Sequence, residues 1–179
     1  MPGLDFPTGN FEFDKRPGIQ MNKTYLLLGS NMGNSRKQLE KAALLIEKKI
    51  GPIIRRSGLY QTAAWGNSNQ PDFLNQVIIV ETSLTAGQSM QTILSIEADM
   101  GRIRTEKNAP RIIDIDILFF NKDIIDEKEL VVPHPAIQLR RFVLVPLNEL
   151  SPNFIHPLLK KTNHHLLLEC ADKLDVKKI

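Results

Sequence analysis

Two aspartates, Asp114 and Asp116, interrupt an otherwise apolar run, RIIDIDILFF, that spans residues 111–120. The β-branched residues of this run favour a strand, in which side chains two positions apart share one face and lie about 6.5 to 7 Å apart. Both carboxylates therefore project together, and the neighbouring isoleucines point to the opposite face. Like charges this close repel unless a cation lies between them, and Mg²⁺ favours a few carboxylates together with water and phosphate oxygens. Taken alone, so short a motif is more often a solvated strand face.

Arginines flank this strand on both sides. Arg102 and Arg104 lie in the charged segment RIRTEKNAP, Arg111 directly precedes the aspartates, and Arg140 follows further along the chain. A guanidinium group matches phosphate oxygens in a two-pronged geometry, so cations beside a two-acid metal site would complete a clamp for a polyphosphate. Any single arginine is explained as well by pairing with the aspartates or by exposure to solvent.

A second group of residues could bind a flat heterocycle. Phe73 and Asn75 occupy positions i and i+2 of an apolar run, so an aromatic ring and an amide share one strand face. Gly29 ends an earlier apolar run, and a residue without a side chain permits a close backbone approach there. His134 lies between two prolines, which hold it where it could meet a phosphate or a base. In isolation, core packing and ordinary turns explain these features as well.

The elements that must position these residues follow from periodicity and turn signals. Strands are predicted at residues 24–31, 53–62, 73–84 and 111–120. Helices are predicted from Ser35 to the stop at Gly51-Pro52, and over 85–101 with Thr85 as N-cap. This β-α-β-β-α-β order predicts an α+β fold with a ferredoxin-like antiparallel sheet and both helices packed on one face. A C-terminal addition, making a three-layer αβα arrangement, is predicted to be irregular and then apolar over 131–150, with a last helix at 163–174.

Length and composition indicate one globular domain. Of the 179 residues, 42% are hydrophobic, and we expect residues 23–179 to form the domain and 1–22 to be an irregular extension, with Met21 as a plausible natural start. A net charge of +3 is far from the basic signature of a nucleic-acid binder, and no apolar run is long enough to span a membrane. A single cysteine, Cys170, fits a reducing compartment. We therefore expect a cytoplasmic protein that binds small molecules, not nucleic acid or membrane.

Several segments together identify a resemblance to a known family. LGSNMGN, QPDFLNQVIIVET, IEADMGRIR, PRIIDIDILFF, VPHP and RRFVLVPLNEL follow one another in the order and approximate spacing of 6-hydroxymethyl-7,8-dihydropterin pyrophosphokinases. Over residues 24–152 the chain resembles this family of the folate pathway. The resemblance implies that pyrophosphate passes from ATP to the hydroxymethyl group of 6-hydroxymethyl-7,8-dihydropterin, with two Mg²⁺ ions, and that AMP is the other product. We further expect a monomer.

The resemblance also implies roles for individual residues. Asp114 and Asp116 would hold the metal, and Arg102 and Arg111 would act with them in catalysis. The residues expected at the ATP site are Glu97, Arg102, Arg104, Arg111, Ile117, His134 and Arg140. The residues expected at the pterin site are Gly29, Thr62, Trp65, Phe73, Asn75 and Phe142.

Two other classes of protein share parts of this pattern. A nucleotidyltransferase with a Gly-Ser and Asp-x-Asp site has its Gly-Ser close before the acids, whereas Ser30 lies far upstream of Asp114. A ferredoxin-like module that binds RNA needs aromatic residues on the exposed sheet face, whereas the acidic strand would place carboxylates there. The distance of Ser30 from Asp114 argues against a nucleotidyltransferase, and the acidic strand argues against an RNA-binding module.

Overall fold

The computed structural model describes residue 18 and residues 20–64, 69–103 and 109–179. Its strands are β1 (Asn22–Ser30), β2 (Ile53–Arg56), β3 (Tyr60–Thr62), β4 (Phe73–Thr82), β5 (Asp114–Phe120), β6 (Ile125–Glu127), β7 (Leu130–Val132) and β8 (Lys177–Lys178). Its helices are α1 (Ser35–Lys49), α2 (Ala86–Asp99), the 3₁₀ helix η1 (Ile137–Leu139), α3 (Arg141–Leu150) and α4 (Asn163–Glu169). No helix within the described ranges is long and apolar enough to cross a membrane.

The main sheet has the strand order β5-β1-β4-β3-β8, and β2 pairs with β4 further along the edge that β3 also uses. All of these pairings are antiparallel. When β2 and β3 are counted as one broken strand, the order and the β-α-β-β-α-β succession are those of a ferredoxin-like fold. The predicted fold class is therefore confirmed.

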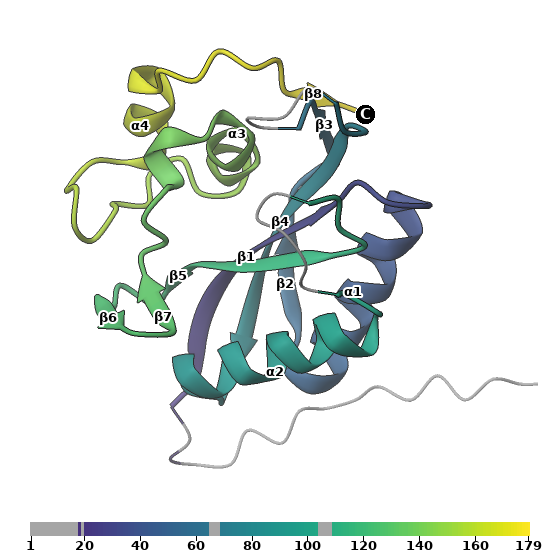
Figure 1. Cartoon of the computed structure of the whole chain (residues 1–179). Helices are drawn as coiled ribbons and strands as arrows, with labels where there is room; N and C mark the ends of the chain where they lie inside the picture. The colour runs from purple at the N-terminus through teal and green to yellow at the C-terminus, as the bar shows by residue number, and fades with distance from the viewer. Residues whose placement is uncertain (1–17, 19, 65–68, 104–108) are drawn as a thin grey trace, which may run out of the picture.

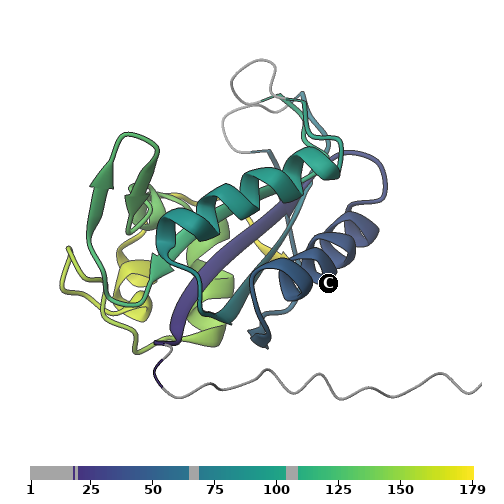
Figure 2. The ribbon, with the colours of Figure 1, turned by 90° about the horizontal axis from the view of Figure 1, so that it is seen from below.

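Helices cover both faces of this sheet. Helices α1 and α2 lie side by side across one face, and α3 and α4 lie on the other (Figures 1 and 2). One apolar core, containing Leu26, Ile78 and Ile93, fills the space under α1 and α2. A second core, containing Phe119 and Leu147, fills the space under α3 and α4. The three-layer arrangement follows from strands that are apolar on both faces.

The first two helices begin where the sequence predicts. The Asn34 side chain accepts the backbone N–H of Lys37 at 3.1 Å at the start of α1. At the start of α2, Thr85 and Gln88 form a reciprocal capping box. Gly51 ends the first helical unit with a φ of +155°, and a Cβ there would lie 2.0 Å from the Glu81 carbonyl oxygen. Only glycine fits this close approach.

Three element predictions need correction. The strand predicted at 53–62 is interrupted at Ser57, because the Ser57 hydroxyl accepts the Val77 N–H at 3.0 Å and so replaces a backbone partner. The segment 131–150 is not irregular: it completes the β6–β7 hairpin and then forms η1 and α3. Helix α3 contains Pro146, yet its buried residues, among them Leu144 and Leu147, pack on the sheet and outweigh the lost helical hydrogen bond. The last helix stops at Glu169.

A register shift between Tyr25 and Leu26 changes the alternation of β5. Before it, Ile113, Ile115 and Ile117 belong to the core under α1 and α2, as expected from the alternation. After it, Leu118 and Phe119 both belong to the core under α3 and α4. The face that carries the aspartates is therefore apolar at one end of β5 and polar at the other. The polar end holds the candidate site.

Candidate active site

Three adjacent strands bring the predicted residues into one row across the sheet. Gly29 of β1 is paired with Asn75 of β4 on one side and with Asp114 of β5 on the other. Directly opposite residues of antiparallel strands point to the same face. A Cβ on Gly29 would lie 2.9 Å from Asn75 Oδ1 and 3.8 Å from a ring carbon of Phe73. Because Gly29 has no side chain, its backbone forms a low surface between the Asn75 amide and the Asp114 carboxylate. This surface is called here the floor.

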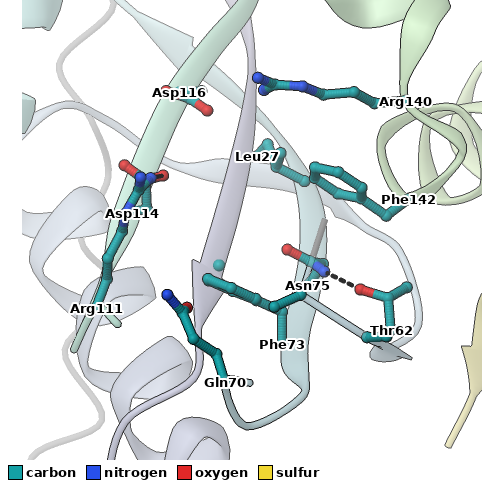
Figure 3. Close-up of a pocket in the computed structure, with 13 residues that line it drawn as sticks. Leu27, Thr62, Gln70, Phe73, Asn75, Arg111, Asp114, Asp116, Arg140 and Phe142 are labelled. Atoms are coloured by element: carbon teal, nitrogen blue, oxygen red, sulfur yellow. Dashed lines mark hydrogen bonds and ion pairs between the residues drawn. The ribbon is translucent and has the colours of Figure 1, made fainter. Parts of the chain in front are cut away.

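A pocket opens above this floor (Figure 3). It is bounded by the sheet, by the start of α3 and by the segments that flank β3 and β4. The residues that line it are Leu27, Gly29, Thr62, Ala63, Ala64, Gln70, Phe73, Asn75, Arg111, Asp114, Asp116, Arg140 and Phe142. Residues far apart in the sequence thus meet in one place. Nine of the predicted site residues are among them.

One end of the pocket is built for a flat, partly polar ring. Phe73 and Phe142 both line it, one from β4 and one from the first turn of α3. The Asn75 amide nitrogen donates to the Thr62 hydroxyl at 3.2 Å, and both side chains are buried. This bond fixes the orientation of the Asn75 amide, with its oxygen next to Gly29. Aromatic faces with a fixed amide between them can stack a heterocycle and read its edge.

The other end of the pocket is charged. Asp116 sits beside Asp114, and burial followed by the charge of Asp114 raises the pKa of Asp116 to about 7, although the positive charge of Arg140 opposes this. Arg140 also stacks over Phe142, with its guanidinium carbon 5.9 Å from the ring centroid. The two ends of the pocket are therefore contiguous. An anionic ligand that carries a flat ring could therefore contact side chains along the whole length of the pocket.

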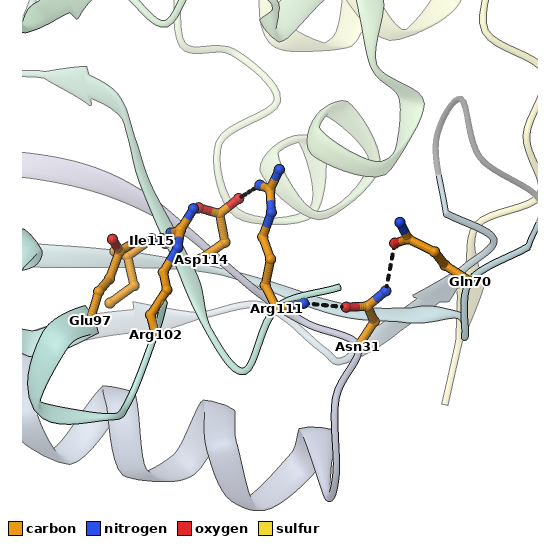
Figure 4. Close-up of polar contacts among 7 residues, drawn as sticks. All are labelled: Asn31, Gln70, Glu97, Arg102, Arg111, Asp114 and Ile115. Carbon is orange, nitrogen blue, oxygen red and sulfur yellow. Dashed lines mark hydrogen bonds and ion pairs between the residues drawn. The ribbon is translucent and has the colours of Figure 1, made fainter. Parts of the chain in front are cut away.

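Asp114 is held by two arginines (Figure 4). Arg102 donates to Asp114 Oδ1 at 2.5 Å, and Arg111 forms an ion pair with Asp114 Oδ2. Burial would lower the pKa of Arg102, but the charges and hydrogen bonds of Asp114 and Glu97 outweigh it and raise that pKa. Both guanidinium groups are thus concentrated at the acidic end, where phosphate oxygens could replace the carboxylate as their partners.

Glu97 supports this end from below. It is a buried residue of α2, and its Oε1 accepts both the backbone N–H of Ile115 at 2.9 Å and the Arg102 guanidinium at 2.5 Å. It does not line the pocket. Its described contacts join α2 to β5. Glu97 therefore helps to hold Arg102 and the backbone next to Asp114 in place.

Asn31 is a residue whose importance the sequence did not reveal. Its side-chain oxygen accepts the backbone N–H of Arg111 at 2.8 Å. Its side-chain nitrogen donates to Gln70 Oε1 and to the Pro71 carbonyl, each at 3.2 Å. It is buried. Asn31 therefore ties the strand that carries the aspartates to the segment leading into β4. The only signal of it was its place in the segment LGSNMGN, because a hydrogen-bonding hub leaves no periodic pattern.

The remaining predicted residues lie around the pocket or outside the described residues. The Ile117 side chain is buried in the core on the opposite face of β5. His134 donates its backbone N–H to the Leu118 carbonyl at 2.9 Å, and burial and then the charge of Arg140 lower the pKa of its ring, which favours neutral imidazole. The predicted Trp65 and Arg104 lie outside the described residues. Ser30, whose hydroxyl donates to Ser35, does not line the pocket, so it does not support the nucleotidyltransferase reading.

The donor set of the acidic pair decides whether it fits a metal ion. Within the described residues, no group of three or more His, Cys, Asp or Glu side chains could hold a metal. Asp114 and Asp116 alone suit Mg²⁺, which completes its shell with water and substrate phosphates. A carboxylate offers about four acceptor positions, so the arginine contacts of Asp114 leave positions for a cation. The repulsion that raises the pKa of Asp116 is also what a cation would relieve.

Comparison with known proteins agrees with this geometry. The family model described as 7,8-dihydro-6-hydroxymethylpterin-pyrophosphokinase (HPPK) matches residues 25–152. The chain is 38% identical over 136 residues to the 2-amino-4-hydroxy-6-hydroxymethyldihydropteridine pyrophosphokinase of Methylorubrum extorquens, which covers 75% of this chain and 86% of the relative. It is 40% identical over 141 residues to the protein of the same name from Aquifex aeolicus, with 79% and 88% covered. The chain belongs to the HPPK family.

Solved structures agree on the fold. A crystal structure of Plasmodium falciparum HPPK-DHPS matches with a TM-score of 0.69 at 22% identity and covers 86% of this chain. The chain spans 46% of the length of that HPPK-DHPS chain. At this identity the likeness shows the fold alone.

Proposed function

We propose that this HPPK-family chain transfers the terminal pyrophosphoryl group of ATP to the hydroxymethyl oxygen of 6-hydroxymethyl-7,8-dihydropterin. The observation that carries the proposal is the pocket itself. It joins a ring-binding end, with Phe73, Phe142 and Asn75, to an acidic end, with Asp114 and Asp116. The family membership supplies the substrates that such a bipartite pocket would take.

The pterin binds at the aromatic end. Phe73 and Phe142 stack on the two faces of the ring system, and Asn75 and Thr62 meet its polar edge. The backbone at Gly29 lies against the ring because no side chain intervenes. Trp65 belongs to this set by the family pattern. In this pose the hydroxymethyl group points across β1 toward the aspartates of β5.

ATP binds at the charged end. Arg111 and Arg140 line the pocket and Arg102 pairs with Asp114, so three cations lie at the end where the phosphates would bind. By the family pattern Arg104 and His134 also belong to the proposed ATP site. Glu97 would act there as the support of Arg102, and Ile117 only through its backbone, because its side chain lies in the core. Asp114 and Asp116 would hold Mg²⁺, with two ions expected, and the ions when bound would neutralise phosphate charge and make the pterin hydroxyl easier to deprotonate.

The reaction is a displacement at the β-phosphorus of ATP. The hydroxymethyl oxygen forms a bond to the β-phosphorus, the bond from that phosphorus to the bridging oxygen of the α-phosphate breaks, and AMP leaves while the hydroxyl gives up its proton. Such a transfer depends mainly on positioning and charge neutralisation. The chain supplies positioning through its two aromatic rings and neutralisation through its arginines. We further propose that it acts as a cytoplasmic monomer.

The assay combines protein, ATP, Mg²⁺ and 6-hydroxymethyl-7,8-dihydropterin and identifies the nucleotide product. AMP together with the pterin diphosphate is expected, and release of ADP or no turnover would refute the proposal. Asp116→Ala should abolish turnover but retain pterin binding, whereas Phe142→Ala should mainly weaken pterin binding. Near-normal turnover of Asp116→Ala would contradict the metal-binding role.

A further inference from the structure

A polar cluster lies beside the pocket, where α3, β3 and β8 meet. The Tyr60 hydroxyl donates to Glu149 Oε2 at 2.5 Å, and the Lys178 ammonium donates to Glu149 Oε1 at 3.0 Å. The backbone N–H of Gly58 donates to both oxygens, at 3.3 and 3.2 Å. Lys178 also lies over the Tyr60 ring, 5.9 Å from its centroid. None of these residues lines the pocket, so the proposed reaction leaves the cluster unexplained.

The electrostatics of this cluster are those of a fixed ionic contact. Burial first, and then the hydrogen bond and charge of Glu149, raise the pKa of Tyr60 to about 12. Burial alone would raise the pKa of Glu149, but the hydrogen bonds from Tyr60, Lys178 and Gly58 outweigh it and lower that pKa. At neutral pH the cluster therefore holds an ionised carboxylate with a neutral phenol as donor.

The cluster is connected to the pocket through the sheet. Asp114, Gly29, Asn75, Tyr60 and Lys178 are successive cross-strand partners in β5, β1, β4, β3 and β8. Tyr60 is thus the direct neighbour of the Asn75 that faces the ring-binding end. The same row that forms the floor of the pocket ends at the contact with Glu149.

The same cluster is connected to the pocket a second time, through α3. Phe142 lies in the first turn of this helix and Glu149 in its last turn. The backbone N–H of Arg141, at the start of α3, donates to Asp172 Oδ2 at 3.0 Å. Asp172 is held in turn, because its Oδ1 accepts the N–H of Leu174 at 3.0 Å. Residues 170–178, called here the C-terminal strap, therefore contact both ends of α3, and Figure 1 shows them running from α4 past α3 to β8.

Helix α3 depends on outside contacts for its placement. It has ten residues, it includes Pro146, and no side chain of its N-cap residue caps it. A helix this short, with an internal proline, is marginal on its own. The carboxylates of Asp172 and Glu149 supply polar contacts at its two ends, in addition to the apolar packing of its buried face.

We propose that Asp172 and Glu149 are positioning residues through which the C-terminal strap sets the placement of α3, and with it of Phe142 against the pterin ring. This inference rests on the proposed function for the identity of the ring. No residue of the strap lines the pocket, so it would act on the affinity for the pterin and not on the chemistry of transfer. The affinity for ATP should fall less than that for the pterin, because the acidic end is built mainly on β1, α2 and β5 and takes only Arg140 from the start of α3.

The test measures pterin binding and amide hydrogen exchange in the full chain. In Glu149→Ala and in Asp172→Ala, the Kd for 6-hydroxymethyl-7,8-dihydropterin should rise about tenfold, equivalent to about 1.4 kcal/mol. The KM for ATP should rise less than this. Exchange at Val143 and Leu144, whose N–H groups donate to the Arg140 carbonyl at 3.1 Å, should become faster. Lys161→Ala, which removes an exposed ion pair with Glu169, is the matched control and should change neither quantity.

Two further comparisons separate positioning from general damage. Asp172→Asn keeps one oxygen that can still accept the Arg141 N–H, and Glu149→Gln keeps one oxygen for Tyr60 or Lys178. Both variants should therefore lose less affinity than the alanine variants. In a Phe142→Ala background, Glu149→Ala should weaken pterin binding no further, because the ring it positions is gone. Unchanged affinity and exchange in both alanine variants, or an equal loss in the Phe142→Ala background, would overturn the inference. If the parent chain bound no pterin, the proposed function would fail, while the exchange rates of α3 would still decide whether the strap holds it.

Discussion

Asn31 and Arg111 hold each other by a reciprocal pair of hydrogen bonds. The Asn31 N–H donates to the Arg111 carbonyl at 3.1 Å, and the Arg111 N–H donates to the Asn31 side-chain oxygen at 2.8 Å. This pair extends the contact between β1 and the chain just before β5, beyond the last paired residues of the two strands. The backbone of Arg111, and so the start of its side chain, is fixed relative to Gly29.

Replacing Asn31 by alanine should therefore impair the use of ATP. The Arg111 N–H would lose its partner, at a cost of about 1–3 kcal/mol if the group stays buried, and its guanidinium would no longer be held at Asp114. We expect kcat/KM for ATP to fall about tenfold or more in steady-state assays. Gln70→Ala removes only one partner of the Asn31 amide and should have a smaller effect. Equal losses in the two variants would contradict a specific role for the Arg111 contact.

Gly29→Ala should weaken pterin binding. The new Cβ would lie 2.9 Å from Asn75 Oδ1, and Asn75 cannot turn away freely because Thr62 accepts its amide N–H. We expect the pterin Kd, measured by fluorescence titration, to rise about tenfold, or about 1.4 kcal/mol.

The matched control for this change is Gly87→Ala. A Cβ on Gly87 meets nothing within 4 Å, and this residue lies in α2. Alanine there should leave pterin binding unchanged and stabilise the protein by about 0.5–1 kcal/mol, since glycine is unfavourable inside a helix. A normal Kd for Gly29→Ala would show that the floor of the pocket tolerates a methyl group.

Glu97→Ala should destabilise the fold more than Glu97→Gln. Alanine removes the acceptor of the buried Ile115 N–H and leaves Arg102 with one carboxylate partner fewer. The loss of a buried partner costs about 1–3 kcal/mol, whereas glutamine retains an oxygen for the same N–H. Urea denaturation of the two variants measures the difference. If both unfold at the same urea concentration as the parent, the contact between α2 and β5 does not support the acidic strand.

Much of the site could be predicted because it depends on alternation within strands. The i, i+2 spacing placed Asp114 and Asp116 on one face and their isoleucine neighbours on the other, which the structure bears out. The same rule put Phe73 and Asn75 together. The β-α-β-β-α-β order placed the strand with Phe73 and Asn75 near the strand with Asp114 and Asp116, but it did not give the register that pairs Gly29 with both Asn75 and Asp114.

The parts that could not be predicted depend on long-range contacts without a periodic pattern. Helix α3 was missed because Pro146 signals a break, whereas tertiary packing of its apolar face overrides that local preference. The strand β8 was missed because two lysines form it, and pairing with β3 stabilises them only in the folded chain. The role of Asn31 was missed for the same reason, because its partners lie on two distant segments.

Metal affinity should increase as pH rises through about 7. Burial and the charge of Asp114 raise the pKa of Asp116 to about 7, so Asp116 is protonated below this pH and ionised above it. A divalent cation requires the ionised carboxylate. Mn²⁺, followed by its electron paramagnetic resonance signal as a substitute for Mg²⁺, should bind more weakly at pH 6 than at pH 8. In Asp116→Asn this pH dependence should largely disappear. An affinity equal at both pH values would show that Asp116 does not titrate in this range.

His156 should make the protein less stable in mild acid. Its ring is buried against Phe119, with the ring centroids 5.5 Å apart. Its Nδ1 accepts the N–H groups of Leu158 and Leu159 at 3.3 and 3.2 Å, so a proton on Nδ1 would face two donors. Burial lowers the pKa of His156 below its ordinary value. The unfolded chain therefore takes up a proton more readily than the folded one, and stability present above the unfolded pKa of about 6.5 is lost as pH falls toward the folded pKa.

The comparison variant is His156→Asn, whose side-chain oxygen can accept the same N–H groups but does not titrate. Between pH 7.5 and pH 5, the free energy of unfolding from urea titrations should fall more in the parent than in His156→Asn. His165→Asn, at an exposed position of α4, should behave like the parent. A parallel fall in the parent and in His156→Asn would mean that the proton uptake on unfolding occurs elsewhere. A smaller fall only in His156→Asn would assign it to the loop between α3 and α4, where a neutral imidazole organises the backbone of residues 156–161.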